Sequence, residues 1–435
     1  MPDPSWLFLA VTLVGAGFTW NAYFPRRGGT PLGIPSFFPG WLTSELAGHH
    51  FAWQLAATAG FGLAGAFERW PGQLGLAITA ASWAALLGLV FVARRGRPVL
   101  RRALDEALGP DHPERIRRQL PPRLAEDRPP DLPWNPFHFH HPGVEVIRNL
   151  RYAPGAGRRH LLDIYRPRDG VGDAPVLLQV HGGGWVMGDK RQQALPLMTH
   201  LASRGWVCVA ANYRLSPAAT FPDHLVDLKQ ALRFIRERIA EFGGDPRFVA
   251  ATGGSAGGHL ASLLALTAED RSLQPGFEEV DTRVQACVPF YGVYDLAGRF
   301  GLEHFDAFER FLGRVVLKRR FSEAPEAFRA ASPVHRVHAD APPFFVIHGT
   351  HDSLAPVEEA RAFVAALREV SKAPVAYAEL PGAQHAFEVF HSLRCRDTVH
   401  AVDRFLAAVL ADWRAAGSGA AQPEPSPVPT PAAAS

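Results

Sequence analysis

The chain has 435 residues, 47% of them hydrophobic, and is long enough for two or three domains. Its 45 basic and 42 acidic residues leave a formal net charge of +3, so the overall charge excludes a general case for nucleic-acid binding. The three cysteines form neither a disulfide framework nor a metal-binding spacing, and we expect buried or inert thiols at Cys208, Cys287 and Cys395.

Three apolar stretches dominate the first hundred residues, at 6–24, 51–67 and 74–93. Each approaches the roughly 20 residues that a helix needs to cross a bilayer core of about 30 Å. A cleavable signal peptide fits poorly, because no basic segment precedes the first stretch and further apolar stretches follow it. We therefore predict an all-α transmembrane region over residues 1–95; the alternative is a set of buried helices in a soluble domain.

The charged residues around these stretches predict their orientation. Arginines follow the first and third stretches, whereas the amino terminus carries only Asp3, and the second connection carries Glu68 against Arg69. By the positive-inside rule, the amino terminus faces outward and everything after the third stretch is cytoplasmic. If the second stretch lay in the membrane interface instead, the orientation of one end would reverse. The arginines concerned are Arg26, Arg27, Arg94, Arg95, Arg97, Arg101 and Arg102.

Residues 96–135 are rich in arginine and proline, and we interpret them as a linker. Near an anionic membrane surface each arginine contributes about 1 kcal/mol of attraction. A solvated helix ending at Pro121 fits the pattern equally well. The aromatic and histidine run at 137–141 has no acid or cysteine at a metal-ligand spacing, so we expect no metal there and assign the run to covering the mouth of a site.

From residue 136 to 415, strand-like and helix-like patterns alternate. The pattern at 223–242 repeats apolar residues at the spacing of a helix face packed on a sheet. Buried strands alternating with helices predict an α/β fold with a mostly parallel sheet covered on both faces. Residues 416–435 are rich in Ala, Pro and Ser, and we expect a disordered tail. The expected strands are 144–152, 160–165, 176–180, 206–212, 247–251, 284–291, 343–352 and 375–380.

A serine flanked by glycines lies in the run 252–258, Thr-Gly-Gly-Ser-Ala-Gly-Gly. A strand pattern precedes this run and a helix pattern follows it at 259–266. That context makes the Gly-x-Ser-x-Gly match a nucleophile elbow, in which a strained turn projects the Ser255 hydroxyl and the glycines leave room around it. For the motif alone, an ordinary turn between strand and helix is the alternative.

Three further stretches supply the groups that a serine nucleophile requires. A buried strand runs into His181 and three glycines, whose backbone N–H groups can stabilise an oxyanion together with the N–H of Ala256. A later buried strand ends in Asp352, and an alternating strand is followed by His385. Serine, acid and histidine in this order, with the last two just past a strand, are typical of the α/β-hydrolase arrangement.

Over residues 140–413 the chain resembles the hormone-sensitive-lipase-like group of α/β-hydrolases. Within that group it is similar to the actinobacterial lipid esterases that carry an N-terminal membrane region. The resemblance is carried by five motifs: His181-Gly-Gly-Gly-Trp185, Asn212-Tyr-Arg-Leu-Ser-Pro217, Gly253-Gly-Ser-Ala-Gly-Gly258, His348-Gly-Thr-His-Asp352 and Gly382-Ala-Gln-His385.

The resemblance implies a serine carboxylesterase or lipase that hydrolyses acyl or lipid esters through an acyl-enzyme, without metal or organic cofactor. It implies Ser255 as the nucleophile, His385 as the general base and Asp352 as the acid that orients the histidine. It also implies a multi-pass protein of the bacterial cell membrane whose partners are the substrate and the bilayer. The positive-inside argument above places the catalytic domain, over 136–415, in the cytoplasm. One departure is Gly254, because many members carry an acid there, and no finer subgroup is assigned. The implied oxyanion donors are Gly183, Gly184 and Ala256.

Several alternatives stay open at this point. The same centre could act on an amide or N-acyl group, and a membrane-tethered scaffold with an inactive hydrolase domain is a less favoured alternative. We expect His181 to brace the glycine loop and His351 to be a bystander. A helical insertion at 295–340 and the segment 110–142 are expected to cover the pocket, so the acyl length is open, as is the oligomeric state. The fallback acids are Asp340, Glu379 and Glu388.

Overall fold

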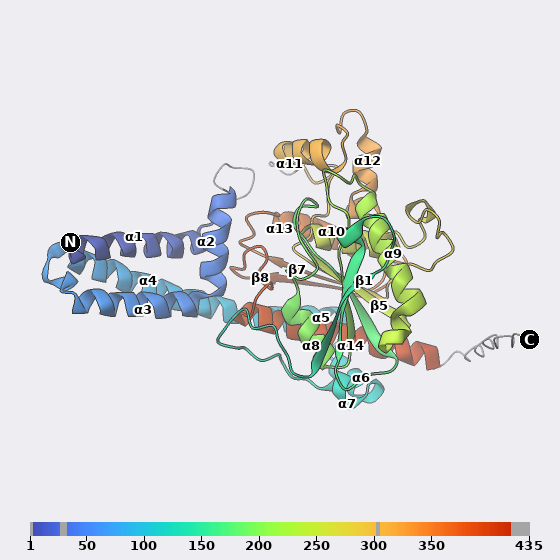
Figure 1. Cartoon of the computed structure of the whole chain (residues 1–435), viewed down its shortest axis with the longest axis horizontal. Helices are drawn as coiled ribbons and strands as arrows, with labels where there is room; N and C mark the ends of the chain where they lie inside the picture. The colour runs from blue at the N-terminus through green and yellow to red at the C-terminus, as the bar shows by residue number, and fades with distance from the viewer. Residues whose placement is uncertain (1–2, 27–32, 302–304, 419–435) are drawn as a thin grey trace, which may run out of the picture.

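The computed structural model describes residues 3–26, 33–301 and 305–418. It consists of a rod of N-terminal helices joined to an α/β body, with the amino terminus at the far end of the rod (Figure 1). Arg27 and most of the expected disordered tail lie outside the described residues, whereas residues 416–418 belong to the last helix.

One eight-stranded sheet forms the centre of the body, with the strand order β1-β2-β4-β3-β5-β6-β7-β8. The six strands from β4 to β8 along this order pair in parallel, while β2 runs antiparallel to both β1 and β4. The sequence-based expectation of a mostly parallel sheet is therefore confirmed. The strands are β1 (Val144–Arg151), β2 (Leu161–Pro167), β3 (Ala174–Val180), β4 (Val207–Ala211), β5 (Gly244–Gly254), β6 (Ala286–Phe290), β7 (Phe344–Gly349) and β8 (Val375–Leu380).

Helices cover both faces of the sheet, as buried strands require. One apolar core joins the sheet to α9, α10 and α13, and a second core on the other face joins it to α5, α6, α8 and α14. The body helices are α8 (Leu195–Ser203), α9 (Asp223–Arg238), α10 (Ala256–Leu266), α13 (Val357–Val370) and α14 (Leu393–Ser418). Shorter helices are η2 (Gly157–His160), η3 (Ile239–Phe242), η4 (Arg271–Leu273), α11 (Phe305–Phe311), η5 (Leu312–Val316), α12 (Pro325–Ala330) and η6 (Pro333–His335).

The segment 96–135, which the sequence suggests is a linker, is instead packed onto the body. It forms α5 (Gly96–Leu108), α6 (His112–Gln119) and α7 (Pro122–Ala125). Leu104 and Ile116 are buried in the same core as α14. The physical reason is amphipathicity: the arginines lie on the outer face of α5, and its leucines recur at the helical spacing on the inner face.

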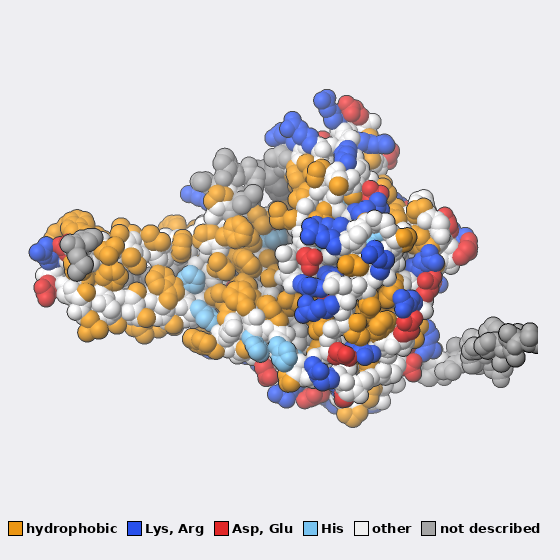
Figure 2. Space-filling view, viewed as in Figure 1, with side chains coloured by type: hydrophobic (Ala, Val, Ile, Leu, Met, Phe, Trp, Pro, Cys, Tyr) orange, Lys and Arg blue, Asp and Glu red, His pale blue; other side chains and the backbone are white. Residues whose placement is uncertain are grey.

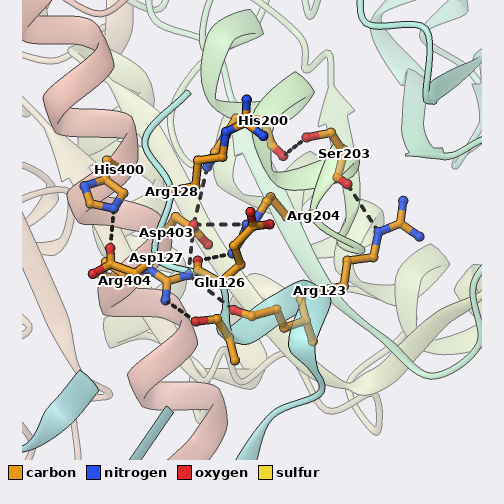
Figure 3. A network of polar contacts seen from close by, with 12 residues as sticks. Arg123, Glu126, Asp127, Arg128, His200, Ser203, Arg204, His400, Asp403 and Arg404 are labelled. Carbon is orange, nitrogen blue, oxygen red and sulfur yellow. Dashed lines mark hydrogen bonds and ion pairs between the residues drawn. The ribbon is translucent and has the colours of Figure 1, made fainter. Parts of the chain in front are cut away.

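A buried carboxylate helps to hold the chain after α7 in place. Asp403 on α14 accepts from His200 on α8 at 3.3 Å and pairs with Arg404 at 3.0 Å (Figure 3). Arg204 in turn binds the Glu126 carboxylate at 2.6 Å. Burial alone would raise the pKa of Asp403, but the hydrogen bond from His200 and the neighbouring arginine charges outweigh it and lower the pKa to about 2.

Four helices form the N-terminal region: α1 (Pro4–Tyr23), α2 (Gly33–Glu45), α3 (Ala47–Leu63) and α4 (Trp70–Arg94), with the short η1 (Ala66–Glu68) before α4. Helices α1, α3 and α4 lie side by side in the rod, and α2 lies across its end next to the body (Figure 1). The three apolar stretches of the sequence correspond to α1, α3 and α4. Helix α2 was not expected.

Two helices in the described part of the chain are long and apolar enough to cross a membrane, Pro4–Tyr23 and the continuous helix Trp70–Leu108. The core helix of a soluble protein or a signal sequence passes the same test. Helix α3 has 17 residues and is shorter than such a span. The three spans and the division into domains therefore stay predictions.

Candidate active site

The turn between β5 and α10 holds Ser255 in a conformation that L-residues rarely adopt. Ser255 has φ +58° and ψ −124°, between the last residue of β5 and the first of α10. The flanking glycines permit this close turn: a Cβ on Gly253 would lie 2.5 Å from the backbone of Gly257, and one on Gly257 would lie 2.2 Å from the carbonyl oxygen of Val180. The sequence therefore builds the strained turn that a nucleophile elbow needs.

An acid and a histidine meet beyond the ends of β7 and β8, two parallel neighbours. His385 Nδ1 lies 2.7 Å from Asp352 Oδ2. The other oxygen, Asp352 Oδ1, accepts the N–H groups of Leu354 and Ala355 at 2.9 and 2.8 Å. His348 Nε2 also lies 3.2 Å from Asp352 Oδ2. The carboxylate is thus surrounded by donors.

The electrostatics keep this acid ionised. Burial of Asp352 would by itself raise its pKa, but the charge and hydrogen bonds of His385 and His348 outweigh burial and lower the pKa below its ordinary value. An ionised acid at Nδ1 fixes the proton of His385 on that nitrogen. The opposite nitrogen, Nε2, is then the one that can take a proton from a substrate or a nucleophile.

One aromatic ring connects the serine turn with the histidine. The Tyr291 ring lies 4.4 Å from the His385 ring, centre to centre. A Cβ on Gly254, the residue directly before Ser255, would lie 2.6 Å from the Tyr291 hydroxyl. Tyr291 therefore packs against His385 and lies beside the residue that precedes Ser255, and the missing side chain at Gly254 makes room for its hydroxyl. In this chain, therefore, the Tyr291 hydroxyl lies close to the position where many family members carry an acidic side chain.

The glycine loop after β3 also reaches the serine. A Cβ on Gly182 would lie 3.2 Å from the Ser255 Cβ. Gly183 and Gly184 have φ +109° and +59°, backbone conformations that glycine alone adopts readily. The Gly182 N–H donates to Gln193 at 2.7 Å and is occupied, while no acceptor is found within the described residues for the N–H groups of Gly183 and Gly184.

Two predicted histidine roles can be compared with the geometry. His181 is buried beneath the glycine loop, where it stacks on Tyr213 at 4.4 Å and bonds the Gly182 carbonyl at 2.8 Å. Burial lowers the pKa of His181 to about 4, so it stays neutral, as suits a brace. His351 contacts the Ala22 carbonyl of α1 at 3.4 Å, and within the described residues it makes no hydrogen bond to Asp352.

The three fallback acids lie in different surroundings. Asp340 pairs with Lys372 on the surface, and Glu379 pairs with Arg361. Glu388 is buried, and its two oxygens accept the Tyr291 hydroxyl at 2.6 and 2.5 Å. None of the three contacts an imidazole nitrogen of His385 in the described structure, whereas Asp352 does.

Two features of the site were missed by the sequence analysis. Helix α2 borders His385, since the Phe37 ring lies edge-on to it at 6.2 Å, and Trp41 Nε1 donates to the Ala386 carbonyl at 2.9 Å. The pair of Tyr291 and Glu388 is the other. The aromatic run around 37–41, between two apolar stretches, was the available signal for α2.

The insertion at 295–340 packs on the glycine-loop side of the site. Phe308 lies 6.4 Å from the ring of Trp185, and the Phe221 N–H donates to the Val316 carbonyl. The histidine run 137–141 packs near the loop after His385, where Phe137 contacts Phe390 at 5.4 Å. Within the described residues no group of three or more His, Cys, Asp or Glu could hold a metal ion.

The chain is similar to bacterial esterases along most of its length. A family model described as BD-FAE matches residues 162–367. The chain is 45% identical to the probable carboxylic ester hydrolase LipM of Mycobacterium tuberculosis over 421 residues, which covers 93% of each chain. It is 41% identical to esterase LipQ of the same organism, over 88% of this chain and 86% of that relative.

Solved structures agree with these relatives. The propionate-bound esterase Est2 of Thermogutta terrifontis is 29% identical, with a TM-score of 0.50, over 61% of this chain and 94% of that chain. The same esterase phosphonylated by sarin gives a TM-score of 0.51 at 28% identity, over 63% of this chain and 97% of that chain. With this fold and these relatives, the chain belongs to the hormone-sensitive-lipase-like family of α/β-hydrolases and is a carboxylic ester hydrolase.

Proposed function

We propose that this protein is a membrane-anchored serine carboxylesterase or lipase that cleaves acyl or lipid esters with Ser255, His385 and Asp352. The observation that carries the proposal is the 2.7 Å contact of His385 Nδ1 with Asp352, in a chain whose Ser255 is held at φ +58° between β5 and α10. This arrangement leaves His385 Nε2 as the base for a serine held on a strained turn.

The reaction follows from these groups. His385 takes the proton of Ser255 as the serine oxygen attacks the ester carbonyl, because a neutral hydroxyl is a weak nucleophile. Asp352 stabilises the imidazolium that forms. His385 then protonates the leaving alcohol, and the acyl group remains on Ser255. Water, deprotonated by His385, releases the acid and restores the free enzyme.

The oxyanion of each tetrahedral intermediate needs donors that are already in position. The N–H groups of Gly183 and Gly184 are the candidates in the loop, because that of Gly182 is engaged by Gln193. The N–H of Ala256 is the third, at the amino end of α10, where backbone donors lack intrahelical partners. Losing one such donor costs about 10²–10³ in rate in comparable sites.

The surface of the rod supports the membrane anchor. Hydrophobic side chains predominate on the face of the rod seen in Figure 2, and charged groups are seen at its tip and over the body. Leu13, Val14, Leu87 and Phe91 are each more than half exposed. Hydroxyls are buried between the helices instead, as in the 2.8 Å contact of Thr19 with Ser82. Apolar side chains outside and polar side chains inside suit a lipid solvent.

The direction of the helices supports a cytoplasmic body. Helices α1 and α4 both run toward the body, and α3 runs back, so three crossings leave the amino terminus and the body on opposite sides (Figure 1). The arginines after α4 then lie on the body side, in agreement with the positive-inside rule.

The test is hydrolysis of p-nitrophenyl esters from acetate to palmitate by the full chain in detergent, with the Ser255→Ala variant and amide counterparts as controls. Loss of ester hydrolysis in the variant, with its melting temperature unchanged, is the expected result. The chain-length optimum then sizes the acyl site. Unchanged hydrolysis in the variant would contradict the assignment of Ser255 as the nucleophile. Faster cleavage of the amides than of the esters would indicate that the substrates are N-acyl compounds.

A further inference from the structure

Helix α2 contacts the loop that carries His385 directly through Trp41 and indirectly through Arg394 of α14. In the middle of the loop, Trp41 Nε1 donates to the carbonyl of Ala386, the residue directly after the histidine, at 2.9 Å. At the start of the loop, Arg394 of α14 donates to the Pro381 carbonyl at 3.1 Å while its guanidinium pairs with Glu45 of α2 at 2.8 Å. These contacts join residues about 345 positions apart in the chain.

The ion pair between α2 and α14 is entirely enclosed. The side chains of Arg394 and Glu45 are 0% and 1% exposed. Ser392 donates a further hydrogen bond to Glu45 at 2.9 Å, and Arg394 also reaches the Ser44 carbonyl. A buried charge is tolerated only when its partners are present, so the body depends on α2 to satisfy Arg394.

The loop needs support because its backbone is strained. Ala386 has φ +62°, a left-handed conformation that is costly for a residue with a Cβ. Such conformations persist only where the surroundings hold them. The Trp41 indole holds the carbonyl of this same residue, and the Phe37 ring packs edge-on to His385 at 6.2 Å.

Helix α2 is in turn fastened to the rod. Asn21 of α1 donates to the Ser36 carbonyl at 2.7 Å and accepts from the Ser36 hydroxyl at 2.6 Å. A Cβ on Gly40 would lie 3.0 Å from the Asn21 amide nitrogen, so the glycine allows the two helices to approach. The only amide side chain in the first apolar stretch of the sequence thus fixes α2 in place.

From these contacts we infer that α2 is part of the catalytic apparatus: Trp41 and Glu45 are positioning residues that hold the His385 loop in its working conformation. The inference rests on the proposed function, since it assigns these residues to the same triad. The rod then does more than anchor the enzyme, because it presents the helix that keeps the general base aligned with Ser255.

The decisive variant is Trp41→Phe in the full chain, which keeps an aromatic ring and removes the N–H that bonds Ala386. We expect kcat for p-nitrophenyl butyrate to fall about tenfold with KM changed less than twofold, because one hydrogen bond to the loop is lost while the substrate contacts stay. The rate at which a fluorophosphonate labels Ser255 should fall by the same factor, because labelling also needs His385.

The matched control is Trp53→Phe, which removes an indole N–H that bonds His50 within α3, away from the loop. It should leave kcat and labelling unchanged. The second variant is Glu45→Gln, which removes the charge that pairs with Arg394 and should lower kcat at least as much as Trp41→Phe.

Unchanged kcat in both Trp41→Phe and Glu45→Gln, with both proteins folded, overturns the inference. A fall in kcat matched by an equal loss in Trp53→Phe also overturns it, because the effect would then be general loosening of the helices. Failure of the proposed function gives a different pattern, in which Ser255→Ala retains wild-type hydrolysis.

Discussion

The rod and the body differ in how much of their apolar surface they bury. In the body, strand residues such as Val176 and Leu178 are fully buried. In the rod, Leu13 and Val14 are 55% and 57% exposed, whereas Thr12 and Thr19 are 7% and 4% exposed. Water drives apolar groups together in the body. The rod buries a small apolar cluster that includes Leu86 and Leu89, and hydroxyl pairs between α1 and α4 add further contacts between its helices.

The seam between the two regions follows neither pattern. It combines a buried ion pair, Glu45 with Arg394, and an aromatic donor, Trp41, bound to a backbone carbonyl. Such groups specify one arrangement of two surfaces, because other arrangements would leave charges and donors unpaired. The rod and the body are therefore joined by specific polar contacts as well as by apolar packing.

The largest expected effect concerns where the body begins. A fragment that starts at residue 136 removes α5, α6 and α7, and with them the buried side chains of Leu100, Leu104, Ile116 and Leu124. At about 1.5–3 kcal/mol for each buried side chain, the loss approaches the whole stability of an ordinary domain. We expect no cooperative thermal transition by circular dichroism. A sharp transition equal to that of the full chain would show that the body folds without these helices.

The next largest effect is on chemistry confined to the body. Asp352→Asn should lower kcat about 10⁴-fold, because the amide no longer fixes the Nδ1–H tautomer of His385. Steady-state hydrolysis of p-nitrophenyl butyrate measures it. Glu379→Gln is the matched control, since Glu379 pairs with Arg361 away from the histidine, and near wild-type kcat is expected. If the two variants lose activity equally, Asp352 is not the acid.

A smaller effect concerns the pH dependence of stability in the body. Burial raises the pKa of Glu388 to about 7 from 4.5, despite the hydrogen bond from Tyr291. Between pH 4.5 and about pH 7, the Glu388 carboxyl is ionised in the unfolded chain but still protonated in the folded protein. The free energy of unfolding therefore falls as the pH rises through this range. At pH 8 the raised pKa of Glu388 lowers the free energy of unfolding by about 3 kcal/mol relative to low pH.

Glu388→Gln removes this titration and should flatten the pH dependence. Denaturant unfolding of the full chain in detergent at pH 5 and pH 8 measures the change. We expect the variant to lose less stability than the wild type between the two pH values. An equal loss in both proteins would assign the pH dependence to other groups, such as Glu359, whose pKa burial also raises to about 7.

The smallest effect lies in the rod. Thr19→Val removes the 2.8 Å contact with Ser82 between α1 and α4 and should cost about 0.6 kcal/mol, the average for such bonds in membrane proteins. Thermal unfolding in detergent detects it. Thr43→Val in α2 is the control, because the Thr43 hydroxyl is buried without a hydrogen-bond partner among the described residues, and no loss is expected there. A larger loss of stability in Thr43→Val than in Thr19→Val would show that the hydrogen bond between Thr19 and Ser82 does not stabilise the rod.

Local patterns in the sequence were enough for much of the fold. The glycines around Ser255, the buried strands before Asp352 and His385, and the mostly parallel sheet were all predicted, because each depends on neighbouring residues and on period-2 or period-3.6 patterning. That the three apolar stretches form helices was predicted for the same reason.

The tertiary structure alone decided which distant segments complete the site. Helix α2 reaches the His385 loop through partners about 345 residues away, and its short aromatic run carries no periodic signal of that contact. Nothing in the sequence indicates that Arg394 and Glu388 are buried, yet folding brings Glu45 and Tyr291 against them. Periodicity is a property of one segment, whereas the partner of a buried charge is chosen by the packing of the whole chain.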